Sequence, residues 1–172
     1  MSAEHHDERF AEWIRDHFAI LHRVVNAFAS GDDRNDLLQE TMLALWRAVP
    51  AFQGASKPST FIYRVAHNAA LLWHRSQRKH RRRIAIASEI DWMMQPGSNR
   101  NRADDPARLE ALYAAIRALP PMDRSLILLS LDGLSYRDIA EIHDLSESNV
   151  GVRLTRLRQR LASIVTEKND HE

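Results

Sequence analysis

Apolar side chains recur at helical spacing through the first part of the chain. Over residues 10–28 they return every three or four positions, and Gly31 follows as a stop signal. A second apolar stripe occupies residues 37–49 and ends at Pro50, and a third occupies residues 62–72. These stripes predict three amphipathic helices that pack together as one small bundle.

Polar residues ahead of the second and third stripes predict where those helices begin. Asp32 or Asp33 is expected to cap the second helix, and Ser59 the third. Their side-chain oxygens can accept hydrogen bonds from the backbone N–H groups that a first helical turn leaves without partners. The third helix is expected to run on into a basic block, RSQRKHRRR, at residues 75–83.

The periodic pattern fades over residues 84–105, where Gln, Pro, Gly, Ser and Asn follow one another. We interpret this segment as a linker between two domains. Two further helices are predicted after it, the first starting at Pro106 and placing Leu109 on its inner face, the second placing Leu131 there.

Two short helices separated by a tight turn are predicted near the end of the chain. Ser135 and Asp138 are spaced as a capping box, Asp144 stands in the turn, and Ser146 can cap the following helix. That last helix has apolar residues on one side and arginines on another. The pattern is typical of a helix-turn-helix, whose second helix enters the major groove of DNA. A plain helical hairpin with a solvated arginine face is the alternative interpretation.

Composition limits the class of protein. The 172-residue chain is 44% hydrophobic and 27% charged, has a net charge of +1 and contains no cysteine. A packed, mostly helical protein without disulfides, thiol catalysis or cysteine zinc sites is therefore expected. No apolar run is long enough to cross a bilayer, so we expect a cytoplasmic protein with no membrane insertion of its own. The basic block favours a polyanionic partner over a merely solvated helix end.

Two stretches of the chain resemble the extracytoplasmic-function group of bacterial sigma factors. The first comprises DLLQETMLALWRAV at residues 36–49 and STFIYRVAHNAAL at residues 59–71, and the second, at residues 118–161, contains LSYRDIAEIHDLSESNV. The resemblance implies an all-α fold of two small helical domains joined by a flexible linker. The implied parts are a region 2-like bundle at residues 1–83, a linker at residues 84–105 and a region 4-like helix-turn-helix domain at residues 106–172.

The resemblance also implies a function without catalysis. It implies binding to core RNA polymerase, at the β′ clamp and the β flap, and promoter-specific initiation of transcription. It further implies promoter DNA and an anti-sigma factor as partners. Neither a cofactor nor a metal is expected, and the two carboxylates of the DLLQE segment lack a third ligand that would suggest a metal site.

Particular residues follow from this resemblance, and their chemistry suits the roles. Carboxylates can pair with a basic coiled coil, aromatic and cationic groups can hold unpaired bases, and arginine and amide groups can read base edges in duplex DNA. The residues implied for core polymerase binding are Asp36, Gln39, Glu40 and Trp46. Those implied for the minus-ten element are Lys57, Thr60, Phe61, Tyr63, Arg64, His67, Asn68, Arg75 and Arg78. Those implied for the minus-thirty-five element are Tyr136, Arg137, Ser148, Asn149, Arg153 and Arg156.

Some of these aromatic residues fit a second interpretation. Trp46 suits a buried core position at least as well as an interface, and Phe61 and Tyr63 suit ordinary core packing. The chain also departs from the family pattern: Asp144 replaces a frequent glycine, and Gly151 replaces a frequently basic residue of the recognition helix.

Three other classes of protein remain as alternatives. A helix-turn-helix regulator could bind operator DNA as a dimer, and stoichiometric binding to core polymerase would separate it from a sigma factor. A metal-dependent nuclease needs a cluster of carboxylates or histidines that the sequence does not show. An adaptor without DNA contacts would require the arginine faces to serve solubility alone.

Overall fold

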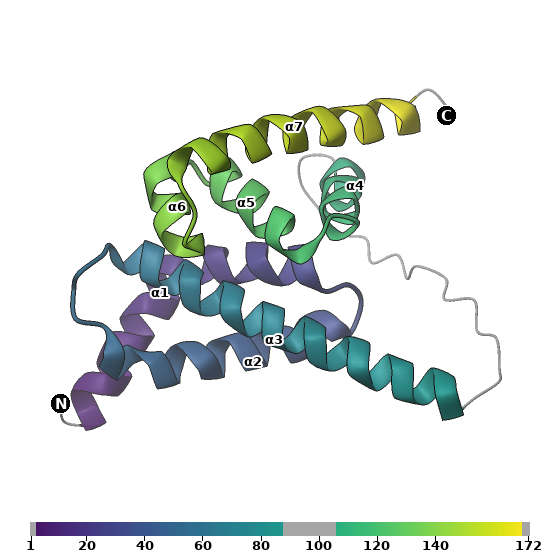
Figure 1. The fold of residues 1–172 in the computed structure, drawn as a ribbon. Helices are drawn as coiled ribbons and strands as arrows, with labels where there is room; N and C mark the ends of the chain where they lie inside the picture. The colour runs from purple at the N-terminus through teal and green to yellow at the C-terminus, as the bar shows by residue number, and fades with distance from the viewer. Residues whose placement is uncertain (1–2, 88–105, 170–172) are drawn as a thin grey trace. The chain divides into compact units, whose positions relative to one another are not determined.

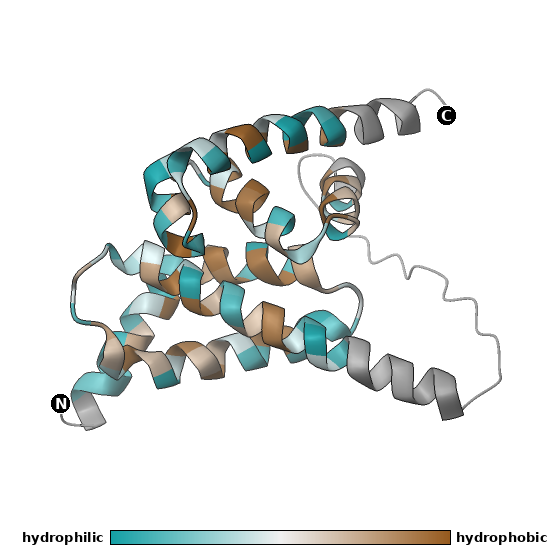
Figure 2. Ribbon diagram, in the orientation of Figure 1, coloured by the Kyte–Doolittle hydropathy of each residue, from teal (hydrophilic) through white to brown (hydrophobic). Residues whose placement is uncertain are grey.

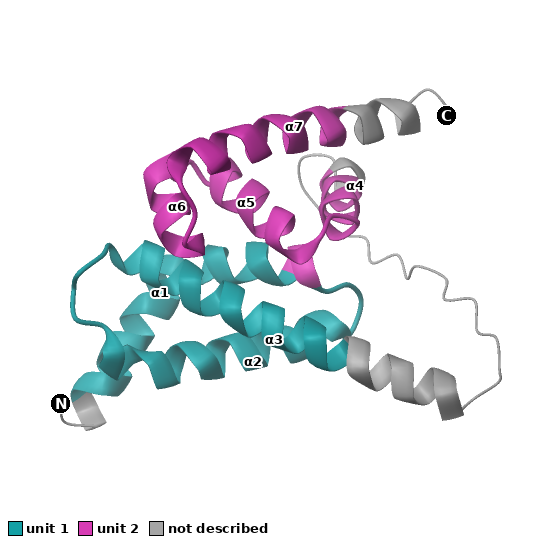
Figure 3. Cartoon of the chain, viewed as in Figure 1, with its two compact units in different colours: residues 1–25, 29–100 teal, residues 26–28, 101–172 magenta. Residues whose placement is uncertain are grey.

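The computed structural model describes the backbone of residues 3–87 and 106–169 and the side chains of residues 5–77 and 109–162. These parts of the chain consist of helices and the short connections between them, and contain no strand. Contacts divide the chain into unit 1, residues 1–25 and 29–100, and unit 2, residues 26–28 and 101–172 (Figure 3). The expected all-α fold with two small helical domains is confirmed.

Unit 1 is built on three helices, α1 (Ala3–Phe28), α2 (Asp33–Ala48) and α3 (Pro58–Ala87), with a short 3-10 turn, η1 (Val49–Ala51), after α2 (Figure 1). The helix α3 packs along α2 and runs in the opposite direction. Hydrophobic and hydrophilic positions alternate along each helix, as amphipathic packing requires (Figure 2). The most deeply buried large side chains of the unit are Leu21, Val24, Val25, Leu37, Leu45 and Ile62.

The starts of α2 and α3 differ in part from the sequence-based expectation. Asp32 precedes α2 as predicted, but its side chain makes no capping hydrogen bond within the described residues. The prediction that Ser59 caps the third helix is wrong, because α3 begins one residue earlier, at Pro58. Proline suits the first helical position, since the N–H that it lacks is one that the helix would leave unbonded.

The end of α3 lies inside the segment predicted to be the linker. The helix continues to Ala87, so residues 84–87 are helical. Residues 88–105, the remainder of that segment, lie outside the described residues.

Unit 2 contains α4 (Pro106–Arg117), α5 (Pro121–Leu131), α6 (Tyr136–His143) and α7 (Glu147–Asn169). The helix α7 packs on each of the other three. The most deeply buried large side chains of the unit are Ile116, Leu119, Leu126, Leu129, Ile139 and Leu154.

Two leucines that were expected to face the core of unit 2 are exposed. The exposed fraction is 52% for Leu109 and 60% for Leu131. Leu126 and Leu129 occupy the inner side of α5, and Leu131 lies about 200° around the helix from Leu129, on the opposite side. Within the described part of the chain, no helix is long and apolar enough to cross a membrane.

Candidate functional site

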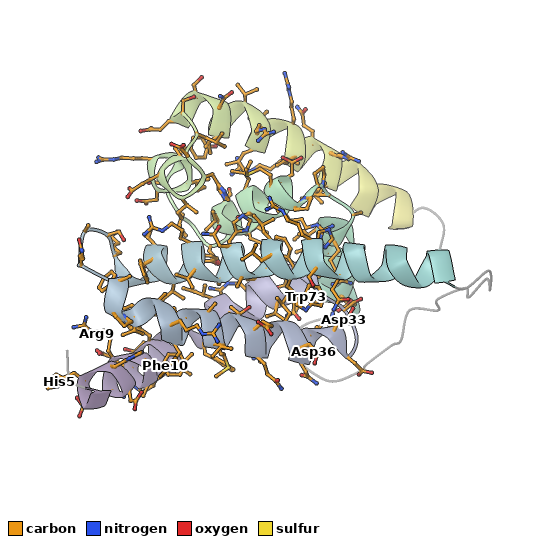
Figure 4. The ribbon with its side chains drawn as sticks, turned by 60° about the horizontal axis from the view of Figure 1, so that its bottom comes forward. His5, Arg9, Phe10, Asp33, Asp36 and Trp73 are labelled. Carbon is orange, nitrogen blue, oxygen red and sulfur yellow. The ribbon has the colours of Figure 1, made fainter. Side chains whose placement is uncertain are left out.

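The first candidate surface is the outer side of α2. Asp36, Gln39 and Glu40 are all exposed, and the two carboxylates lie one helical turn apart. Leu43, three residues after Glu40 and on the same side of the helix, is 40% exposed. Asp36 belongs to the first turn of α2, and Figure 4 places it in the same part of the view as Trp73, near the middle of α3. The outer side of α2 therefore carries two carboxylates near its start and one exposed leucine, and the exposed Arg47 lies on the same side at its end.

Trp46 lies next to this surface and is held by the start of α1. The core interpretation of Trp46 is wrong, because the residue is 40% exposed. Its ring stacks on that of His6, with centroids 4.6 Å apart, and its Nε1 donates to Oδ1 of Asp7 at 3.1 Å. Nε2 of His6 donates to the carbonyl oxygen of Trp46 at 2.7 Å. The indole is thus exposed but fixed in orientation.

The second candidate surface consists of Lys57, which directly precedes α3, and of Arg64, Asn68 and Arg75 on α3; we call these four residues the outer face of α3. These four side chains are exposed. The spacings of 4 and 7 residues keep Arg64, Asn68 and Arg75 within a sector of about 40° on the helix. Together with Lys57 they offer three cations and one amide.

Four other residues implied for the minus-ten element are buried. The exposed fraction is 8% for Thr60, 7% for Phe61, 2% for Tyr63 and 4% for His67. The structure therefore does not bring the predicted set together on one surface. The remaining member, Arg78, lies outside the residues whose side chains are described.

Phe61 belongs to an aromatic cluster inside unit 1. Its ring centroid lies 5.1 Å from that of Phe52 and 5.7 Å from that of Trp13. The guanidinium carbon of Arg64 lies 5.5 Å from the same ring centroid. The buried ring of Phe61 therefore holds the exposed guanidinium of Arg64 in place through a cation–π interaction.

The helix-turn-helix predicted from the caps is present in unit 2. The backbone N–H of Asp138 donates to Oγ of Ser135 at 3.1 Å, and that hydroxyl donates to Oδ2 of Asp138 at 2.7 Å. The backbone N–H of Asn149 donates to Oγ of Ser146 at 3.3 Å. Asp144 adopts the left-handed conformation with φ of 54°, which gives α6 a C-terminal stop that is usually made by glycine.

The third candidate surface is the exposed side of this motif. All six residues implied for the minus-thirty-five element are exposed, whereas Val150, Leu154 and Leu157 of α7 are buried. The first turns of α7 therefore present hydroxyl, amide and guanidinium groups on a packed scaffold. The exposed set is Tyr136, Arg137, Ser148, Asn149, Arg153 and Arg156.

Comparison with known proteins identifies both units. Residues 10–80 match the family model of sigma-70 region 2, and residues 109–161 match that of sigma-70 region 4. The ECF RNA polymerase sigma-E factor of Haemophilus influenzae is 29% identical over 144 residues, which cover 79% of this chain and 76% of the relative. That of Escherichia coli K12 is 28% identical over 148 residues, 79% of this chain and 75% of the relative. The chain belongs to the extracytoplasmic-function (ECF) group of sigma factors.

Solved structures agree on the fold of this ECF sigma factor. RpoE from Bartonella quintana, solved with the anti-sigma factor NepR, has a TM-score of 0.65 at 20% identity, covering 91% of this chain and 95% of that chain. CnrH, solved with the cytosolic domain of CnrY, has a TM-score of 0.62 at 20% identity, covering 94% and 90%. The expectation of a sigma factor that directs transcription initiation is confirmed, and the stand-alone operator-binding regulator is not favoured.

In the recognition helix of this sigma factor, Gly151 lies next to the ring of Tyr136. A Cβ atom at this position would lie 3.4 Å from Cε2 of Tyr136, an ordinary van der Waals distance, so alanine would also fit beside the ring. Nη1 of Arg158 donates to Oη of Tyr136 at 3.4 Å, and Nη2 donates to Oγ of Ser130 at 2.6 Å. Tyr136 is therefore anchored on α7, beside Gly151.

His143 is a residue of the motif that the sequence reasoning missed. Its Nε2 lies in a 2.8 Å hydrogen bond with Oγ of Ser125, which ties the end of α6 to α5. Burial, together with the positive charge of Arg153, lowers the pKa of His143 to about 4. The ring therefore stays neutral at physiological pH, next to the turn that positions α7.

Acid should destabilise the folded chain through His143. Between its ordinary pKa of 6.5 and its folded pKa of about 4, the unfolded chain holds one more proton than the folded chain. The free energy of unfolding therefore falls as the pH drops through this window, by about 1–2 kcal/mol after allowance for the partial exposure of the ring. Urea unfolding at several pH values measures the slope. The variant His143→Leu should lose this contribution, and an unchanged slope would contradict the assignment.

Proposed function

We propose that this ECF sigma factor divides its work among three surfaces. The outer side of α2 binds core RNA polymerase, the outer face of α3 holds the opened minus-ten strand, and the exposed side of the helix-turn-helix reads the minus-thirty-five duplex. The observation that supports this most is that each surface exposes its polar residues while the same helices bury their apolar ones.

Charge and shape support the assignment of α2. Two exposed carboxylates one turn apart, Asp36 and Glu40, suit a basic coiled coil such as the β′ clamp of polymerase. Trp46 adds a large aromatic group whose orientation is already fixed by His6 and Asp7, so little conformational entropy is lost when a partner covers it. Unit 2 is assigned to the β flap of polymerase.

The outer face of α3 suits a single strand of DNA. Lys57, Arg64 and Arg75 offer positive charge for phosphates, and the Asn68 amide can donate to and accept from an exposed base edge. Direct contact by Phe61 or Tyr63 would require these side chains to leave the core, since both are buried. We therefore assign the buried members of the set to the support of this face.

The exposed side of the helix-turn-helix suits duplex DNA. Asn149, Arg153 and Arg156 carry the groups that pair with adenine and guanine edges in the major groove. Tyr136 and Arg137 begin α6, where phosphate contacts position such motifs on the duplex.

Further parts of the proposal concern chemistry, location and regulation. No catalytic step is assigned to the chain, and it acts in the cytoplasm, where core polymerase is found. An anti-sigma factor is proposed as a regulator, by analogy with RpoE and CnrH, which were solved with NepR and CnrY.

Run-off transcription with core polymerase and a promoter library tests the function as a whole. Transcripts that start at a common sequence motif, and that require the added chain, are the expected result. Core polymerase alone is the control. Specific binding of operator DNA by the free chain as a dimer, without transcripts in the presence of core polymerase, would contradict the proposal.

The variant Asn68→Ala should separate strand opening from promoter recruitment. The amide is expected to meet a base only after the strands part, so closed-complex affinity should stay unchanged while opening falls about five- to tenfold. Permanganate reactivity of promoter thymines measures opening, and gel shift measures recruitment. Ser76→Ala, an exposed change off the outer face of α3, is the matched control. Normal opening by Asn68→Ala would exclude this role.

A further inference from the structure

One side chain of the recognition helix does not fit the polar pattern around it. Val152 is 49% exposed. Among the described residues of α7 from Glu147 to Arg160, it is the one exposed residue with a large apolar side chain. Valine is a poor residue for an exposed helix, because its branched side chain loses rotamer freedom there. Helix stability therefore gives no reason for it.

The position of Val152 places it among the residues proposed to read bases. Ser148 lies four residues before it, Asn149 three before and Arg156 four after, and all are exposed. Residues at these spacings share one side of a helix. A branched apolar group thus stands in the middle of the DNA-reading side, within the first turns that enter the groove.

The ring of Tyr136, at the start of α6, lies close to Gly151 of this helix. Gly151 adds no side chain, and Cε2 of Tyr136 lies 3.4 Å from where a Cβ of Gly151 would be. Tyr136 is itself 39% exposed. Gly151 and the Tyr136 ring therefore lie at the edge of the reading side, about 100° around α7 from Val152, and Val152 supplies the exposed apolar group within it.

Only one of the four DNA bases presents a methyl group in the major groove that an exposed apolar side chain can contact. In the major groove the edges of guanine, cytosine and adenine offer hydrogen-bonding groups, whereas thymine also presents its C5 methyl group. We infer that Val152 reads the C5 methyl of a thymine in the minus-thirty-five element, and is thus a specificity-determining residue of this chain. This inference rests on the proposed function of the helix-turn-helix.

Replacement of thymine by deoxyuridine isolates the methyl group, because it leaves base pairing and every hydrogen-bonding group unchanged. The holoenzyme, made of the full chain and core polymerase, first selects a promoter fragment from a library randomised in the upstream element. Each thymine of the selected element is then replaced by deoxyuridine, one at a time. At one position the replacement should lower closed-complex affinity about three- to fivefold, the effect of one lost apolar contact.

Variants connect this effect to Val152. With Val152→Ala the penalty for deoxyuridine at that position should fall below about 1.5-fold, and with Val152→Ile it should persist. Arg160→Ala, which removes a charge further along α7, should leave the penalty in place and serves as the matched control.

The outcomes separate this inference from the proposed function. If the holoenzyme forms and selects an element, but no thymine position responds to deoxyuridine or Val152→Ala keeps the penalty, the inference is overturned and the sigma-factor assignment stands. An element selected without thymine overturns it as well. If no holoenzyme forms, or the library yields no sequence preference upstream, the proposed function of unit 2 fails first.

Discussion

The double variant Asp36→Arg with Glu40→Arg should lower the affinity of the chain for core RNA polymerase about a hundredfold or more. Each substitution removes an attraction to a basic partner and adds a repulsion, and close interfacial charge pairs contribute on the order of 2–5 kcal/mol when disrupted. Both residues are exposed, so the core of unit 1 should be unaffected. Titration of labelled chain with core polymerase measures the affinity.

A matched control exists on another helix of the same unit. Glu8 and Glu12 of α1 are also exposed carboxylates four residues apart. Their reversal to arginine changes the net charge equally and should leave affinity within about twofold of the original, because they lie outside the assigned surface. Asp36 belongs to the first turn of α2, so its reversal also costs about 0.3–1 kcal/mol of helix stability, which a thermal melt detects. Unchanged affinity in a folded double variant would remove α2 from the polymerase interface.

The second large effect is expected from Arg153→Ala with Arg156→Ala. Each arginine that reads a base is worth about 1–3 kcal/mol, so the double variant should lose about a hundredfold in promoter recruitment. Once the holoenzyme is bound, the open complex should still form on a premelted template, because the outer face of α3, which holds the opened strand, is intact. The loss of Arg153 also removes a charge that lowers the pKa of His143, so that pKa should rise toward its ordinary value. Proton NMR of the imidazole follows this change.

Salt dependence distinguishes base reading from phosphate contact in these variants. If an arginine contacts only phosphate, its replacement by alanine should weaken binding equally for all DNA sequences. The replacement should also reduce the dependence of affinity on salt concentration by a slope of about one. Arg160→Ala on the same helix is the control for the loss of charge alone. Recruitment that survives in the double variant at physiological salt would contradict the assignment of α7 to the duplex.

The helix-turn-helix was predictable because its signals are local. Ser135 and Ser146 act on backbone groups only three residues away, and both caps are present. The buried stripe of α7 likewise follows from spacing along one helix. Such patterns need no knowledge of the rest of the fold.

Contacts between distant residues were not predictable in the same way. The stacking of His6 on Trp46 joins residues forty positions apart, and the hydrogen bond between Ser125 and His143 joins different helices. Leu131 shows the same limit: a leucine at helical spacing carries no information about which side its neighbours cover. These features depend on how helices pack, which periodicity alone does not specify.

The candidate site was predicted as a set of residue types but not as a surface. Arg64, Asn68 and Tyr63 were predicted to lie together, whereas burial separates the first two from the third. Val152 was not among the predicted site residues, and an apolar residue in an amphipathic helix ordinarily faces inward. The exposed fraction of Val152, which sequence cannot supply, is what distinguishes it.

The left-handed Asp144 has a consequence for how the motif meets DNA. Glycine in this turn would explore many backbone angles, whereas an aspartate has few, and reaching φ of 54° costs it on the order of 1 kcal/mol. The same restriction leaves the turn with fewer ways to open once it is formed. The helices α6 and α7 should therefore hold the same relative orientation before and after they bind DNA. Little conformational entropy is then lost on binding.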